Sequence, residues 1–213
     1  MRGPEPDGVS RPLPPGKGVG ARGRRTQCTL LLALPLPPAL SQPPLDLPTL
    51  MQRMARRKGG EARFTEERSV GGLDSPLYAS GTLSFSAPSR FVRQTLQPTR
   101  ETMELDGRTL RLVRGGRTRQ LDLDSVPEVA ALLEAMRATL TGDLPLLRRH
   151  FRAELSGEER KWVLLLTPLD ARLAVQLHAI EIVGQDADLR SILLQLKGGD
   201  RSLMLVEPLV ETK

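Results

Sequence analysis

The chain has 213 residues and a formal net charge of +6, but six basic and only two acidic residues lie in residues 1–41. The remaining 25 basic and 23 acidic residues leave a net charge of only +2. Aromatic residues make up 3% of the chain, whereas a sheet that binds nucleic acid needs exposed rings for stacking. Composition and charge therefore argue against nucleic acid as a partner.

Residues 1–41 have the layout of a secretory signal peptide. Three arginines within residues 22–25 precede an apolar run over residues 29–40, and the small residues Ala39 and Ser41 stand at positions −3 and −1 of a cut before Gln42. The run is too short and too rich in proline to span a membrane as a helix. We therefore expect export.

The basic, proline-rich stretch before this run has two explanations. Either the true start lies downstream, near Val19, and residues 1–18 are not translated, or the protein is cytosolic and has a disordered N-terminal tail. Cys28 is the one cysteine of the chain and lies in this leader, so no disulfide is expected. We expect residues 42–213 to form a single domain.

A short helix is predicted to open this domain at Asp46-Leu47-Pro48, with Arg56 to Lys58 in its last turn and Gly59-Gly60 ending it. A strand over residues 62–70 follows. Apolar and polar residues then alternate from Ser80 to Leu123, with breaks at Pro88, Pro98, Asp106-Gly107 and Gly115-Gly116. This pattern predicts an antiparallel meander with one apolar face that must be covered.

Ser125-Val126-Pro127-Glu128 is a helix start, and Thr141-Gly142 ends the helix. Between them an apolar stripe is formed by Val129, Leu132, Leu133, Met136 and Leu140. Asp143 is predicted to cap a second helix, Leu144 to His150.

Five further strands are predicted at residues 151–155, 161–167, 175–182, 189–196 and 202–206, with a helical turn at residues 172–174. The strand at 161–167 is apolar on both faces, which predicts a central position. A change of alternation near Ala179 predicts a bulge. Strands, helices and strands in this order indicate an α+β fold with one large antiparallel sheet.

Chemistry-bearing patterns are scarce. His150 and His178 form no H-x-x-x-H pair, and no G-x-S-x-G motif is present. We therefore expect no enzyme activity, metal or cofactor. Trp162 is either a core residue or a cavity wall, and methionines such as Met103 suit a cavity that accepts flexible chains.

Several motifs in order resemble the LolA superfamily of periplasmic lipoprotein carriers, in its LolA-related branch. They are A-R-F-T-E-E-R, S-G-T-L-S-F-S-A-P-S-R-F and E-L-D-G-R-T-L-R-L, and the resemblance covers residues 44–206. It implies a strongly bent antiparallel sheet forming an incomplete barrel, with helices covering the open side and an apolar cavity between them. The cavity would shelter the acyl chains of a lipid or lipoprotein.

The resemblance also implies partners: an inner-membrane exporter and an outer-membrane acceptor, with the chain itself a monomer. In the family an arginine before the strand-end proline ties the lid shut, whereas Ala87 precedes Pro88 here, which leaves Arg90 as the candidate lid-tethering residue. The expected lipid-binding residues are Leu83, Phe85, Met103, Leu105, Leu110, Leu112, Leu133, Met136, Trp162 and Leu164. The alternative is a non-catalytic envelope accessory protein with a filled core that binds a protein partner through its sheet surface.

Overall fold

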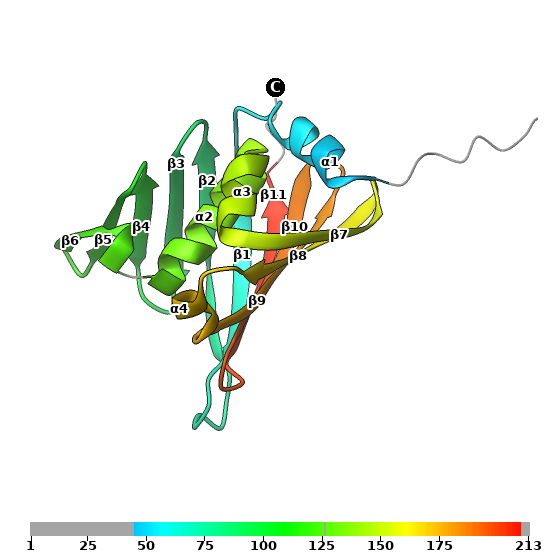
Figure 1. The fold of residues 1–213 in the computed structure, drawn as a ribbon. Helices are drawn as coiled ribbons and strands as arrows, with labels where there is room; N and C mark the ends of the chain where they lie inside the picture. The colour runs from blue at the N-terminus through cyan, green and yellow to red at the C-terminus, as the bar shows by residue number, and fades with distance from the viewer. Residues whose placement is uncertain (1–44, 126, 210–213) are drawn as a thin grey trace, which may run out of the picture. The chain divides into compact units, whose positions relative to one another are not determined.

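The computed structural model describes residues 45–125 and 127–209, which form one eleven-stranded sheet with four α-helices and a 3₁₀ turn (Figure 1). The predicted leader and the predicted cut before Gln42 lie outside these residues. The strands are β1 (Gly59–Ser69), β2 (Leu77–Ser86), β3 (Arg90–Gln97), β4 (Glu101–Asp106), β5 (Thr109–Arg114), β6 (Arg117–Asp122), β7 (Phe151–Glu158), β8 (Lys161–Pro168), β9 (Leu177–Gln185), β10 (Asp188–Leu196) and β11 (Arg201–Pro208). The helices are α1 (Leu47–Met54), α2 (Pro127–Thr141), α3 (Leu144–His150) and α4 (Ala171–Ala174).

The strand order is β6-β5-β4-β3-β2-β1-β11-β10-β9-β8-β7, and all neighbours are antiparallel. Within the described residues β6 and β7 stand at opposite ends of this order, so the barrel is incomplete. Helices α2 and α3 lie across one face of the sheet (Figure 1). The predicted α+β fold, a bent antiparallel sheet with helices over its open side, is confirmed.

The meander follows the alternation in the sequence. Leu83 and Phe85 of β2 are buried, as are Leu105 of β4 and Leu110 of β5. The turn between β5 and β6 is Gly115-Gly116, and both glycines have positive φ, 55° and 74°. Such backbone angles are strained for other residues, which explains why the chain reverses at this point.

Helix α1 begins as predicted and ends earlier. Asp46 caps it, because its Oδ1 accepts a hydrogen bond of 2.7 Å from the Thr49 amide. The helix ends at Met54, so residues 56–58 lie beyond its last turn, and Gly59-Gly60 open β1 instead of ending the helix. A Cβ at Gly59 would lie 2.9 Å from the Phe85 carbonyl oxygen, so the glycine allows β1 to pair closely with β2.

Helices α2 and α3 match their predicted ranges, and a 3₁₀ turn at Leu123–Ser125 precedes α2. Gly142 has φ 67° and ends α2 against α1, where a Cβ would lie 2.0 Å from the Met51 carbonyl oxygen. Asp143 caps α3, accepting a hydrogen bond of 2.9 Å from the Leu146 amide. Gly142 thus ends α2 in close contact with α1, and Asp143 begins α3 directly afterwards.

The second group of strands confirms one prediction and corrects another. The pairing of β9 with β10 shifts register where Ala179 and Leu177 face Gln195 and Leu196, which is the predicted bulge. Strand β8 is not central, because only β7 lies beyond it. Its outward residues, such as Leu165, are half-buried and not covered by a second layer, so apolarity on both faces did not indicate a central strand here.

Candidate functional site

A cavity of about 550 Å³ lies between the sheet and helix α2. This volume falls within the roughly 300–1,000 Å³ that is usual for small-molecule sites. Its apolar lining consists of Leu83, Phe91, Met103, Leu132, Leu133, Met136, Val175, Ile192, Leu194, Leu196 and Met204. Side chains from both halves of the chain thus form one apolar wall.

Strand register explains how distant residues reach this wall. Ile192 of β10 pairs with Met204 of β11, and Leu83 of β2 lies two strands away from Met103 of β4 in the same cross-strand row. Partners in an antiparallel pair project to the same face, so these side chains share the concave face. The facing wall comes from α2, where Leu132, Leu133 and Met136 lie within about one turn.

A smaller hollow of about 60 Å³ adjoins the cavity. It shares Leu83, Phe91, Met136 and Ile192 with the larger space and is also lined by Phe85. The apolar wall therefore continues toward the end of β1 that follows α1.

One charged pair lies within the cavity wall. Arg93 donates to Oε2 of Glu66 at 2.5 Å, and the hydroxyl of Ser202 donates to Oε1 of the same carboxylate at 2.5 Å. The Arg93 guanidinium carbon also lies 4.6 Å from the ring centroid of Phe64. The side chains of Arg93 and Glu66 are only 20% and 15% exposed, so each charge compensates the other where both are largely shielded from water.

The cavity has a buried end and an exposed end. Leu83, Phe91 and Met136 are at most 6% exposed. At the other end the lining residues are exposed, namely Arg68, Val175, Gln176, Lys197 and Arg201. The loop after β1 and the turn between β10 and β11 meet here, because the Gly71 amide donates to Asp200 at 2.7 Å.

The predicted lipid-binding residues separate into groups by position. Leu83, Met103, Leu133 and Met136 line the cavity, and Phe85 lines the smaller hollow. The remaining ones lie outside both linings: Leu105, Leu110, Trp162 and Leu164 are buried in the core, and Leu112 is half-buried. The binding role of each residue stays a prediction.

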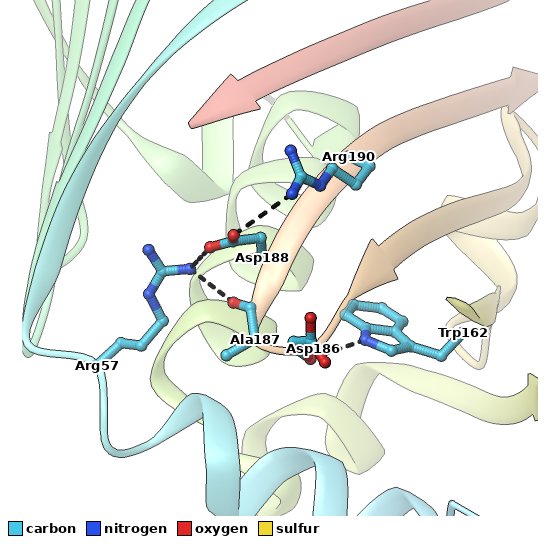
Figure 2. Close-up of polar contacts among 6 residues, drawn as sticks. All are labelled: Arg57, Trp162, Asp186, Ala187, Asp188 and Arg190. Carbon is cyan, nitrogen blue, oxygen red and sulfur yellow. Dashed lines mark hydrogen bonds and ion pairs between the residues drawn. The ribbon is translucent and has the colours of Figure 1, made fainter. Parts of the chain in front are cut away.

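Arg90 lies on the opposite face from Phe91 and forms an ion pair of 2.9 Å with Glu104 of β4. Its predicted lid-tethering role therefore stays a prediction that this contact does not support. Another arginine connects the segment after α1 to the sheet. Arg57 donates to the carbonyl of Ala187 at 2.6 Å and to Asp188 at 2.5 Å (Figure 2).

A second ion pair joins α1 to the turn between β7 and β8, where Arg53 donates to Glu159 at 2.5 Å. This hydrogen bond raises the pKa of Arg53 and lowers the pKa of Glu159. Beside Arg57, Trp162 donates from its indole nitrogen to the Asp186 carbonyl at 3.0 Å (Figure 2). Helix α1 is thus tied to two adjacent hairpin turns.

Several cavity residues were not predicted. The apolar ones, including Phe91, Ile192, Leu194 and Met204, alternate regularly within their strands, so assigning a face to each strand would have found them. Arg93 and Glu66 carry no such indication, because a charged residue on an apolar face reads as an interruption of the pattern.

Among residues 45–125 and 127–209, no three His, Cys, Asp or Glu side chains lie close enough together to hold a metal ion. None of the helices that the structure describes has the length and apolar character needed to cross a membrane.

The chain belongs to the family described as outer membrane lipoprotein carrier protein LolA-like, whose model matches residues 39–208. The resemblance to the LolA superfamily is therefore confirmed. No curated protein matches the chain.

Solved structures with a similar chain path share little sequence. A LolA superfamily protein from Nitrosomonas europaea is 9% identical over 79% of this chain and 96% of its own, with a TM-score of 0.43. A putative outer membrane lipoprotein-sorting protein domain from Vibrio parahaemolyticus is 12% identical over 78% and 93%, with a TM-score of 0.43. The Pseudomonas aeruginosa MucA/MucB complex gives 17% identity over 76% of this chain and 56% of that chain, with a TM-score of 0.43.

Proposed function

We propose that this protein is a periplasmic carrier that shelters the acyl chains of a lipid or lipoprotein in the cavity between the sheet and α2. The observation that carries the proposal is the cavity of about 550 Å³, walled by apolar side chains at one end and open to polar residues at the other. An amphiphile has the same division into an apolar and a polar part. The family description, an outer membrane lipoprotein carrier protein LolA-like, supports the same function.

The energetics of such a carrier are favourable. Removing an acyl chain from water is worth about 0.8 kcal/mol for each methylene buried. Met103, Met136 and Met204 lie in the lining, and methionine side chains adapt to ligands of different shape. Leu133 and Met136 of α2 can pack against the sheet when no cargo is bound, so helix and cargo compete and the affinity stays low enough for release.

The partners and location follow from this role. We propose that residues 1–41 direct export, that residues 42–213 act as a monomer, and that cargo passes from an inner-membrane exporter to an outer-membrane acceptor. The support is the basic and apolar layout of residues 22–40 together with the family description.

The experiment is titration with a fluorescent fatty acid, cis-parinaric acid, whose emission rises in an apolar site. Leu194 lines the cavity, whereas the neighbouring Leu193 points to the other face of β10. Leu194→Trp places a bulky ring in the cavity and should reduce the emission increase that the unaltered protein gives, while Leu193→Trp should keep it. Equal binding by both variants would contradict an acyl chain in this cavity.

A second candidate is a protein partner bound at the outer sheet surface. Leu203 and Tyr78, both exposed, flank Glu67 in one cross-strand row, and Leu205 nearby is 52% exposed. Exposed apolar side chains in a cluster indicate an interaction surface. This candidate predicts that Leu205→Asp removes a partner captured by crosslinking in the envelope, while fatty-acid binding is unchanged.

A further inference from the structure

The exposed end of the cavity carries an excess of positive charge. Arg68 of β1, Lys197 after β10 and Arg201 of β11 all line this end, and all three are exposed. Their backbone positions are held together by sheet pairing, because Arg68 pairs with Ser202, which follows Arg201. Three side chains distant in sequence thus gather at one opening.

Two of these cations contact side chains that are not carboxylates. Lys197 contacts the imidazole of His178 at 3.2 Å, and Arg201 contacts the hydroxyl of Ser69 at 3.5 Å. In the part of the chain that the structure describes, none of the three forms an ion pair. Glu66 is already paired with Arg93, and the remaining carboxylate, Asp200, accepts the Gly71 amide. Three cations therefore face one acidic group.

Ion pairs elsewhere on the sheet show how other cations are matched. Arg90 and Arg111 both contact Glu104, and Arg114 contacts Glu101, on strands that lie away from this opening. Within the described residues the three cations at the cavity opening form no such pair, so they are available to an anionic ligand.

We propose, resting on the carrier function above, that the cavity selects amphiphiles with an anionic headgroup. Arg68, Lys197 and Arg201 bind the headgroup, and the acyl chain of the ligand lies along Leu83, Met103 and Met136. The two ends of the ligand then meet surfaces of matching character. Charge attraction at an exposed site is modest for each pair, and three pairs together give roughly a tenfold preference at low ionic strength. The preference decreases as salt is added.

The test compares cis-parinaric acid with its methyl ester, which has the same chain and no charge, at mildly alkaline pH and low ionic strength. The unaltered protein should bind the acid about tenfold more tightly than the ester. The triple variant Arg68→Gln, Lys197→Gln, Arg201→Gln should bind both equally, at the affinity that the unaltered protein has for the ester. Sodium phosphate should displace the acid no better than sodium chloride of equal ionic strength.

A matched control removes the same charge elsewhere. Arg63→Gln, Arg117→Gln and Arg119→Gln alter exposed residues outside the cavity lining, and this variant should keep the preference for the acid. Equal binding of acid and ester by the unaltered protein, or loss of the preference in the control, would overturn the headgroup site and leave the carrier function intact. Specific displacement by phosphate would mean a free-anion site and would also overturn it. Binding of neither probe would overturn the carrier function itself.

Discussion

Arg57 and Asp188 join two parts of the chain that are 131 residues apart, through a hydrogen bond of 2.5 Å between guanidinium and carboxylate. Arg57 also donates to the Ala187 carbonyl, and Asp188 lies 3.6 Å from Arg190 (Figure 2). The segment after α1 is therefore fixed to the turn between β9 and β10, at the rim of the smaller hollow that Arg57 helps to line.

Removing this contact should weaken the fold modestly. Arg57→Ala is expected to lower the free energy of unfolding by about 1 kcal/mol, because a partly exposed charged hydrogen bond is lost. Urea unfolding followed by circular dichroism measures this change. Arg56→Ala removes the same charge from an exposed neighbouring residue and should have no measurable effect. Equal stabilities for the two variants would contradict a tether at Arg57.

The ion pair of Arg53 with Glu159 makes a pH-dependent contribution to stability. The hydrogen bond from Arg53 lowers the pKa of Glu159 in the folded state, so folding favours the ionised carboxylate. This contribution is complete above the ordinary glutamate pKa and is lost as the pH falls through the lowered value. Glu159→Gln should therefore be less stable than the unaltered protein at neutral pH, and the difference should vanish in acid. Urea midpoints measured across this range test it, and a difference independent of pH would contradict it.

Trp162 and Gly184 fit against each other so closely that a Cβ at position 184 would lie 2.0 Å from the indole ring. Gly184→Ala should lower the free energy of unfolding by about 2 to 3 kcal/mol, because the buried ring must move. Tryptophan fluorescence during urea unfolding reports the change. Gly71→Ala, whose Cβ would meet only the Asp200 carboxylate at 3.5 Å, serves as the control and should be close to neutral. A tolerated Gly184→Ala would show that Trp162 is held less tightly than the structure indicates.

Met103 and Leu112 are cross-strand partners on the same face, yet only Met103 belongs to the cavity lining. The alternation places both on the apolar face, and the family resemblance predicts that this face binds lipid. Met103→Gln should weaken binding of cis-parinaric acid roughly tenfold, because a polar amide replaces apolar wall. Leu112→Gln should change the affinity by no more than about twofold, since Leu112 lies outside the cavity. Comparable losses in both variants would mean that cargo contacts the sheet well beyond this cavity.

The contrast between Met103 and Leu112 shows which features of the site the sequence predicts. A period of two assigns Met103, Leu105 and Leu112 to one face, and the structure agrees. Which part of that face stays open depends on where α2 crosses it, and the crossing is set by long-range packing such as that of Gly142 on Met51. Local patterns contain no information on where α2 crosses the sheet, so the alternation groups Leu105 with Leu83 although only Leu83 lines the cavity.

Arg90 is the candidate lid tether because the family carries an arginine directly before the proline that is Pro88 here, at the position of Ala87, and Arg90 lies close by. That role stays a prediction. Arg53 and Arg57 bind partners more than 100 residues away. Pairing over such a separation has no periodic pattern in the sequence, and only the folded chain reveals it.

The carrier function is tested by lipid extraction from the purified exported protein, followed by mass spectrometry. We expect the unaltered protein to hold acyl-bearing species at a molar ratio near one, and Leu194→Trp, whose ring would take up part of the cavity, to hold less. Absence of acyl species from the unaltered protein, together with no binding of cis-parinaric acid, would contradict a carrier function.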